Sequence, residues 1–229
     1  MIVYKRSLSI ILLCIVTATS QAQDWPNLKR YQNENAALTS PKLDEHRIVF
    51  MGNSITEGWG KKHPEFFMNN AYINRGIGGQ TTPQMLLRFR QDVIDLNPVA
   101  VVILAGTNDI AENTGPSTIK MIINNVISMA ELAKANNIKV VLCSVLPAFE
   151  FPWRQGLEPA GKVVRLNALI KKYANDHDIV YVDYFTPMAN SSNGLKDELG
   201  DDGIHPNING YLIMEPLIEE GIRKSLENK

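Results

Sequence analysis

The sequence predicts an α/β protein built on a parallel sheet that helices cover on both faces. Short apolar runs alternate with longer segments in which apolar residues recur at helical spacing, as expected of repeated βαβ units. The runs are apolar almost throughout, as strands buried on both faces should be. Polar turns that contain glycine follow the first three runs. Because the carboxyl ends of parallel strands meet at one edge of a sheet, we expect these turns to converge there.

Five runs are expected to form the strands of this sheet. The plainest is 99–104, which is apolar at every position, and the first holds the β-branched pair Ile48 and Val49. The crossovers between consecutive strands should be right-handed. In chain order, the expected strands are 46–51, 71–75, 99–104, 138–145 and 179–184.

The remaining segments are expected to be mainly helical. Residues 24–38 should form a short N-terminal helix against the body of the protein, with Pro26 near its start. Pro83 should open a helix that Thr81 or Thr82 caps. The other expected helices follow Pro116, span 163–173 and close the chain around 211–222.

The first 22 residues are expected to be a secretory signal peptide and not part of the fold. Two basic residues precede an apolar core at 8–18, and Ser20-Gln21-Ala22 places small residues at positions −3 and −1 of a cleavage site before Gln23. The core is shorter than the roughly 20 apolar residues that a membrane-spanning helix needs. The residue before Cys14 is too bulky for the usual lipoprotein cleavage site. No repeat or linker divides the remainder, so we expect residues 23–229 to form a single exported domain without stable membrane insertion.

The charge and cysteine content restrict the class of protein further. The leader takes two of the 23 basic residues and none of the 24 acidic ones, so the mature chain carries a net charge of −3. Such a mild negative charge gives no footprint for nucleic acid or for an anionic membrane. Cys143 is the only cysteine left, and its apolar surroundings indicate a buried residue rather than a reactive thiol. Export without disulfides favours a bacterial periplasmic or extracellular location.

A candidate nucleophile follows the first strand. Gly52, Asn53 and Ser54 stand where that strand should turn sharply at the carboxyl edge of the sheet, and open α/β sheets place their chemistry at this edge. The alternative is that Asn53 or Ser54 only caps the next helix, as these residue types commonly do. The spacing Gly52-x-Ser54-x-Thr56 is not the G-x-S-x-G of α/β-hydrolases, which argues against that fold.

A candidate base lies in the loop after the fifth strand. His205 follows Asp202 by three residues, and this spacing across a tight turn can place a carboxylate on imidazole Nδ1. Such a bond fixes the tautomer and leaves Nε2 free to take a proton from a serine hydroxyl. The alternative is that Asp202 caps the last helix and His205 is an exposed turn residue.

Two further turns offer hydrogen-bond donors for a developing oxyanion. Gly79 follows the second strand and can present its N–H because no Cβ blocks the approach. Asn108 follows the third strand and can offer its side-chain amide. Alternatively, Gly79 only serves a helix-entry turn and Asn108 a local turn. Taken together with the serine and the histidine, however, they complete a site for acyl transfer.

This set of residues resembles the four blocks of the SGNH (GDSL) hydrolase superfamily, and the resemblance covers essentially the whole mature chain. The blocks here are Gly52-Asn53-Ser54, Gly79, Gly106-Thr107-Asn108-Asp109 and Asp202-Gly203-Ile204-His205. The platelet-activating-factor acetylhydrolase-like bacterial esterases are a close comparison within the superfamily, which suggests acetyl-sized acyl groups.

The resemblance implies a flavodoxin-like three-layer αβα sandwich with a parallel five-stranded sheet. It implies serine esterase activity without a metal or cofactor. Ser54 would be the nucleophile, and His205 the base with Asp202 as its partner. The oxyanion hole would consist of the N–H groups of Ser54 and Gly79 and the side chain of Asn108.

Two positions depart from the superfamily pattern. Asn53 stands where the family often has Asp, but an amide can still accept a hydrogen bond there, so activity should survive. Gln80 stands where many relatives carry Asp, which we expect to bear on substrate preference more than on the chemistry.

The substrate is less sharply indicated. The loop 146–161 carries Trp153 and Arg154, which could form a platform for a sugar ring and a contact to an acid or hydroxyl, or could pack against helices. No long apolar lid is evident. We therefore expect an exported serine esterase that removes small acyl groups, acetyl in particular, from a small-molecule or oligosaccharide ester. The alternatives are a lysophospholipase or thioesterase, and a non-catalytic carbohydrate-binding module. The sequence does not indicate an oligomeric state.

Overall fold

The computed structural model describes residues 23–227, and the expected signal peptide at 1–22 lies outside the described residues. Five parallel strands form one sheet in the order β2-β1-β3-β4-β5. The expected strands are all present, and the main difference is that the last is only three residues long. Their bounds are Ile48–Gly52 (β1), Tyr72–Gly76 (β2), Ala100–Leu104 (β3), Lys139–Cys143 (β4) and Val180–Val182 (β5).

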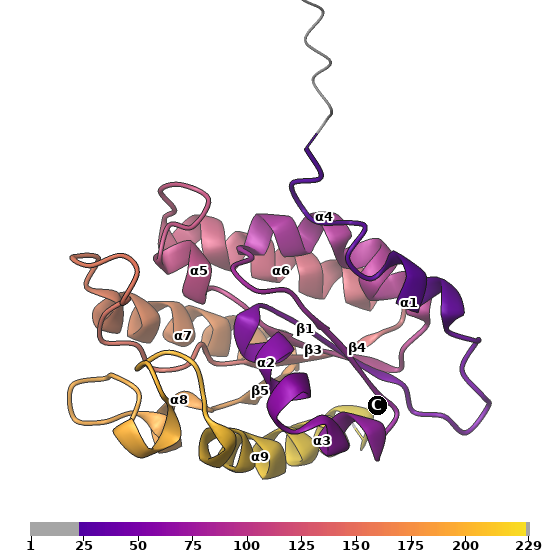
Figure 1. The fold of residues 1–229 in the computed structure, drawn as a ribbon. Coiled ribbons are helices and arrows are strands. Elements are labelled where there is room, and N and C mark those ends of the chain that lie inside the picture. Colours follow the sequence, from indigo (N-terminus) through magenta and orange to yellow (C-terminus); the bar gives the residue numbers. More distant parts are fainter. Residues whose placement is uncertain (1–22, 228–229) are drawn as a thin grey trace, which may run out of the picture.

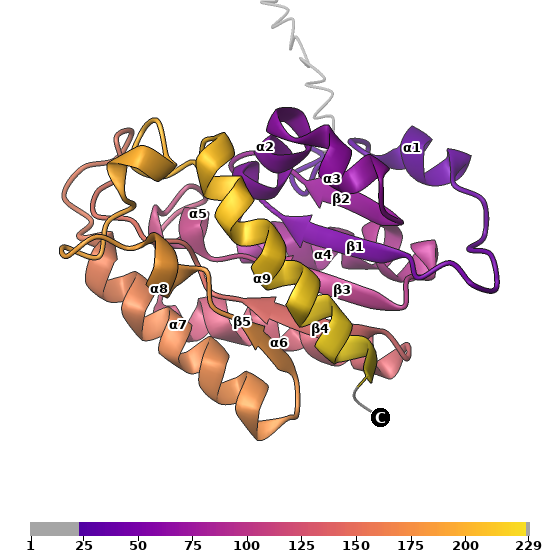
Figure 2. The same ribbon diagram turned by 90° about the horizontal axis from the view of Figure 1, so that it is seen from below.

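Helices cover both faces of the sheet, as Figures 1 and 2 show. One face carries α4 (Thr82–Asp92), α6 (Ile119–Ala135) and α7 (Pro159–Asp176). The other carries α2 (Ser54–Lys62), α3 (Pro64–Met68) and α9 (Ile208–Glu227). This arrangement is the expected three-layer sandwich. The short helices are α1 (Gln32–Ala37), α5 (Thr107–Ile110), α8 (Phe185–Met188) and two 3₁₀ turns, Ile94–Leu96 and Asp197–Leu199.

The strands place alternate side chains in two separate cores, because successive residues of a strand point to opposite faces. In β1, Val49 and Met51 pack beneath α4 and α6, whereas Ile48 and Phe50 pack against α2 and α3. The ring of Phe50 makes an edge contact with Trp59 of α2 at a centroid distance of 5.9 Å. Burial of each large apolar side chain contributes about 1.5–3 kcal/mol, and these residues therefore hold β1 rigidly at the centre of the sheet.

The strand order reverses at β1. The chain passes from β1 to β2 at one edge and then returns to β3 on the other side of β1. In open α/β sheets, ligands bind at the carboxyl ends of the strands beside such a reversal. Gly52 at the end of β1 pairs with Gly76 of β2 and Leu104 of β3, so the turns after these three strands begin side by side.

The N-terminal segment 23–37 runs across the outside of the α4 layer. We expected a helix over 24–38, but turns occupy most of its first half and only α1 is helical. Three glutamine side chains of the neighbouring segment donate hydrogen bonds of 2.7 Å to its backbone carbonyls. The pairs are Gln80 with Pro26, Gln84 with Trp25, and Gln91 with Leu28.

Candidate active site

The turn after β1 presents Ser54 at the start of α2. A Cβ on Gly52 would lie 2.0 Å from Oγ1 of Thr56, so only glycine fits where the strand bends into the helix. The side chain of Asn53 caps α2 by accepting the N–H of Ile55 at 3.0 Å. The sequence left open whether Asn53 or Ser54 caps this helix. The cap is Asn53, so the hydroxyl of Ser54 is available for another partner.

That partner is His205. Ser54 Oγ lies 2.8 Å from His205 Nε2, although 151 positions separate the two residues in the chain. His205 Nδ1 lies 2.7 Å from Oδ2 of Asp202. The backbone N–H groups of His205 and Ile204 donate to Oδ1 of the same carboxylate at 2.7 and 3.0 Å. One carboxylate thus holds both the turn and the imidazole ring, and the ring connects it to the serine.

The charge state of Asp202 suits this arrangement. Partial burial acts to raise the pKa of Asp202, but the backbone N–H of His205, its ring and the N–H of Ile204 outweigh burial and lower the pKa below its usual value. The neighbouring Asp201 instead forms an exposed ion pair of 3.0 Å with Lys62. The carboxylate that faces His205 is therefore the one three residues before it.

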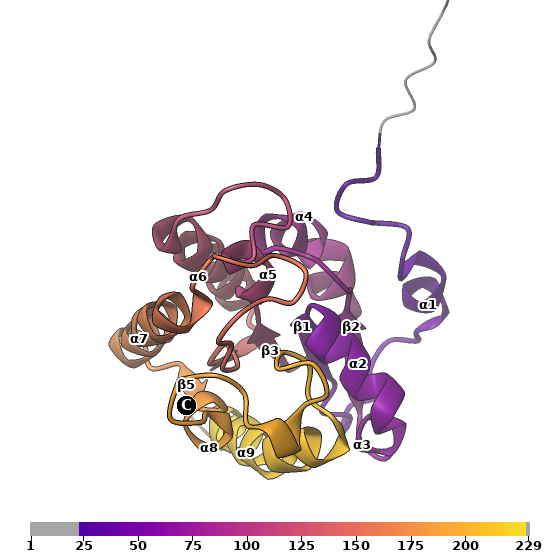
Figure 3. The same cartoon turned by 60° about the vertical axis from the view of Figure 1, so that its left-hand side comes forward.

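The turns after β2 and β3 meet beside Ser54. Gly79 has a backbone φ of +76°, a conformation that favours glycine. Asn108 is buried, and its Nδ2 donates one hydrogen bond of 2.9 Å to the carbonyl of Gln80. An amide nitrogen carries two N–H groups, so the second remains for a ligand. Figure 3 brings forward this edge of the sheet, where the start of α2 lies among the loops that precede α7 and α9.

Residues 50–213 match the GDSL-like Lipase/Acylhydrolase family, which is a class of carboxylic ester hydrolases. The chain belongs to this family. A GDSL-like lipase from Bacteroides thetaiotaomicron is 55% identical, with a TM-score of 0.85 over 87% of this chain and 98% of that one. A proposed acylhydrolase from Bacteroides fragilis is 51% identical, with a TM-score of 0.88 over 90% of this chain and 100% of that one. These neighbours confirm the expected fold.

A curated relative of this GDSL-like acylhydrolase is an acetylxylan esterase from Xylanibacter ruminicola. The two are 25% identical over 224 residues, which cover 82% of this chain. The chain spans 45% of the length of that relative.

Of the two residues expected to contact substrate, Trp153 and Arg154, the loop before α7 brings only Trp153 close to His205 of this GDSL-like acylhydrolase. The Trp153 ring lies 6.2 Å from that of His205, and its indole N–H donates to Oδ1 of Asn113 at 3.2 Å. Arg154 instead donates to the carbonyl of Glu112 at 2.9 Å and to its carboxylate at 3.3 Å. Its guanidinium is thus bound to a protein partner, and contact of Arg154 with a substrate stays a prediction.

Gln80 is held inside the protein. Only 3% of it is exposed, and its side chain accepts a hydrogen bond of 2.6 Å from Arg88 while donating to Pro26. The side chain points into the protein, so any effect of Gln80 on substrate preference would be indirect.

Sequence reasoning missed two residues that shape the turn at Gly79. Asn113 donates to the carbonyl of Gly79 at 3.2 Å, and Glu57 accepts the N–H of Gly78 at 2.9 Å. Glu57 lies one helical turn after Ser54, and this spacing was the only available signal for it.

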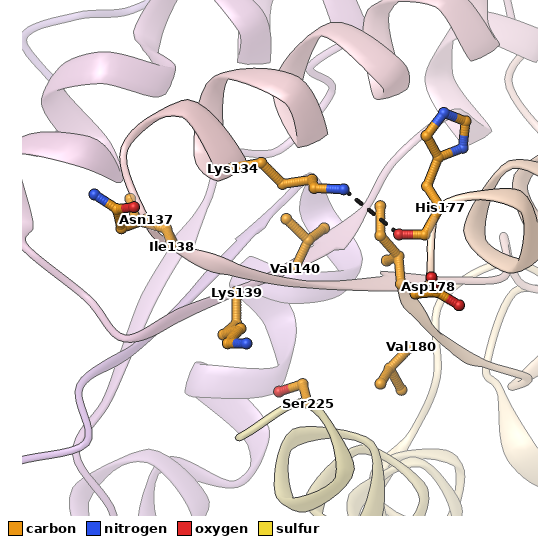
Figure 4. A pocket seen from close by; sticks show the side chains of 10 residues that line it. Lys134, Asn137, Ile138, Lys139, Val140, His177, Asp178, Val180 and Ser225 are labelled. Atoms are coloured by element: carbon orange, nitrogen blue, oxygen red, sulfur yellow. Dashed lines mark hydrogen bonds between the residues drawn. The ribbon is translucent and has the colours of Figure 1, made fainter. Parts of the chain in front are cut away.

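One cavity is remote from this edge. It has a volume of about 700 Å³ and lies at the amino ends of β4 and β5, where Lys134 donates to the carbonyl of His177 (Figure 4). Within 23–227, no group of His, Cys, Asp or Glu is arranged to hold a metal ion. The same stretch contains no helix long and apolar enough to cross a membrane.

Proposed function

We propose that the protein is a serine esterase that removes small acyl groups, acetyl in particular, from carbohydrates outside the cytoplasm. The observation that carries the proposal is the continuous hydrogen-bonded chain from Ser54 through His205 to Asp202, with links of 2.8 and 2.7 Å. A base within hydrogen-bonding reach of the hydroxyl, and itself oriented by a third group, is the arrangement that activates a serine.

The proposed reaction follows from these positions. Ser54 Oγ attacks the ester carbonyl carbon while His205 Nε2 takes its proton, which gives a tetrahedral oxyanion. His205 then returns that proton to the alcohol oxygen as the carbon–oxygen bond of the ester breaks, leaving an acyl group on Ser54. Water repeats the two steps on the acyl-enzyme and releases the acid.

The oxyanion would be held by three donors. As the first residue of α2, Ser54 has a backbone N–H with no partner inside the helix. The Gly79 N–H and the second N–H of Asn108 Nδ2 complete the proposed hole. Donors fixed in advance cost no reorganisation when charge develops, and this accounts for much of the rate in such sites.

A carbohydrate substrate is supported by the surface beside the acid–base turn. Trp153 is 47% exposed and lies against His205, so its ring can stack on a sugar. A cavity of about 310 Å³ next to Gly203 is lined by Phe149 and by the polar side chains of Glu150, Asn190 and Asp197. The name of the relative from Xylanibacter ruminicola, acetylxylan esterase, indicates a carbohydrate substrate for that protein. Export is proposed from the composition of residues 1–22.

The size of the acyl group is tested by chain length. We expect rates on p-nitrophenyl esters to fall steeply from acetate to butyrate and to be negligible at octanoate. A small site excludes each added methylene sterically. Burial of that methylene would stabilise binding by at most about 0.8 kcal/mol, which does not offset the exclusion. The screen should include acetylated xylo-oligosaccharides, with released acetate as the readout. Rates that rise with chain length would favour a lysophospholipase or thioesterase, and sugar binding without any turnover would favour a binding module.

The role of Asn108 is tested by substitution. We expect Asn108→Ala to lower kcat by about 10²–10³-fold with little change in KM, because the bond to the oxyanion tightens only in the transition state. Steady-state kinetics on p-nitrophenyl acetate measures both constants, and circular dichroism checks that the fold is kept. A change confined to KM would make Asn108 a substrate-binding residue and remove it from the oxyanion hole.

A further inference from the structure

A buried arginine connects the two halves of the proposed oxyanion hole. Arg88 lies on α4 and is 0% exposed. Its Nε donates to Oε1 of Gln80 at 2.6 Å, and its Nη2 donates to the carbonyl of Gly52 at 3.1 Å. Its Nη1 forms an ion pair of 3.0 Å with Asp92, whose side chain is also fully buried. The guanidinium is therefore neutralised on one side and bound to two separate loops on the other.

These two loops supply the backbone donors. Gly52 ends β1 two residues before Ser54, and Gln80 directly follows Gly79. The Gln80 carbonyl also accepts the hydrogen bond from Asn108, and its side-chain nitrogen is bound to Pro26. Gln80 is thus held at three atoms, by groups from three different segments of the chain. Arg88 links this anchored turn to the end of the strand that precedes Ser54, where the backbone N–H of Ile77 donates to the same carbonyl of Gly52 at 3.2 Å.

We infer that Arg88 is a positioning residue which, through Gln80, sets the spacing between the N–H of Ser54 and the N–H of Gly79. The inference rests on the proposed serine esterase chemistry. The turn after β2 contains Gly78 and Gly79, and glycine has more backbone freedom than any other residue. Oxyanion donors act only when they are held within about 0.5 Å of the productive geometry. A planar guanidinium with donors in a fixed fork can hold two acceptors at a set separation.

The decisive variant is Arg88→Lys, compared with Arg75→Lys. Lysine keeps the charge but offers a compact ammonium that cannot reproduce the fork. We expect Arg88→Lys to lower kcat on p-nitrophenyl acetate by about 10²-fold and to leave KM within about threefold. A 10²-fold loss is the cost of misplacing catalytic groups by about 1 Å.

Arg75 is a matched control. It is also buried, at 5% exposed, but its guanidinium contacts Asn35, the carbonyl of Asn74 and the ring of Tyr31. None of these groups belongs to the two segments that Arg88 joins, and Arg75 reaches the Arg88 ion pair only through Asn35, which donates to Asp92 at 2.7 Å. Arg75→Lys should therefore lower thermal stability without changing kcat by more than about threefold, as expected when only buried packing and hydrogen bonding outside the site are disturbed.

Gln80→Met keeps the inference testable if Arg88→Lys does not fold. Methionine approximates the length of glutamine but removes the acceptor that Arg88 binds. We expect a fall in kcat of the same order as for Arg88→Lys. The double variant should lose less than the product of the two single losses, because both changes break one connection.

A transition-state analogue separates positioning from general destabilisation. A trifluoromethyl methyl ketone adds to Ser54 Oγ as the proton passes to His205, and the resulting oxyanion occupies the hole. Its inhibition constant should rise in step with the loss of kcat/KM in Arg88→Lys and Gln80→Met, but not in Arg75→Lys. Equal losses in the two arginine variants, or an unchanged inhibition constant, would overturn the inference. Wild-type turnover is measured first, because its absence would count against the proposed esterase and not against this role of Arg88.

Discussion

Replacing Ser54 by alanine is expected to lower kcat by about three to six orders of magnitude while leaving the fold intact, since serine and its base act as one unit. The hydroxyl contributes one short hydrogen bond, to His205, and the cap of α2 is made by Asn53. Loss of the Ser54 hydroxyl should therefore abolish most of the activity without removing a contact that the fold needs. The residual rate would come from the oxyanion donors and from substrate binding.

Rates of p-nitrophenyl acetate hydrolysis, with thermal melts of the same samples, measure both parts of this expectation. Ser225→Ala serves as the control, because that hydroxyl is buried in α9 and donates to the carbonyl of Ile222. It should alter stability but not kcat. An Ser54→Ala protein that kept a tenth of the wild-type rate would exclude Ser54 as the nucleophile.

Replacing Asp202 by asparagine should lower kcat by up to about 10⁴-fold, as loss of the orienting carboxylate does in other triads. The amide oxygen can still accept the N–H groups of Ile204 and His205, so the turn should persist. The amide nitrogen, however, would face His205 Nδ1 as a donor and favour the wrong tautomer. Asp201→Asn should change kcat by less than about threefold, because Asp201 makes only an exposed ion pair with Lys62.

The pH dependence of this effect follows from the charge state of Asp202. Its pKa is lowered in the folded protein, so its contribution is present above the usual carboxylate range and is lost only as the pH falls through the lowered value. Asp202 should therefore stay ionised between about pH 5 and 8, and Asp202→Asn should remain well below wild type throughout this range. If Asp201→Asn lowered kcat strongly and Asp202→Asn left it near the wild-type value, the triad acid would be Asp201.

The sequence predicted the sheet well because the strands carry their own signal. The run that became β3 is apolar at every position, and both of its faces are covered. The N-terminal helix was overestimated because a local feature competes with helix formation there. Asn27 adopts a left-handed backbone conformation with a φ of +55°, and the Asp24 carboxylate accepts the N–H groups of Leu28 and Lys29. Such side-chain bonds offer the backbone an alternative to the helix.

The sequence indicated which residues of the proposed site come together, but not the tertiary partners of the others. Glycine, serine and histidine in the turns after parallel strands indicated which side chains meet, because the edge of the sheet brings them together. Arg154 and Gln80 each had several possible partners in the sequence. Glu112 and Arg88 became their partners only through the packing of separate loops and helices. Residue types within one turn cannot specify such a choice.

The segment that the three glutamines hold is bound through its backbone carbonyls, which every amino acid possesses. Substitutions along 25–29 should therefore be tolerated during evolution wherever they leave the path of the chain unchanged, unlike at Tyr31, whose buried side chain donates to the carbonyl of Gly76. An insertion or deletion of one residue there should not be tolerated, because it would move the carbonyl of Pro26 away from Gln80 and so disturb a turn beside Ser54. Among related sequences, we expect this stretch to vary freely in composition and hardly at all in length.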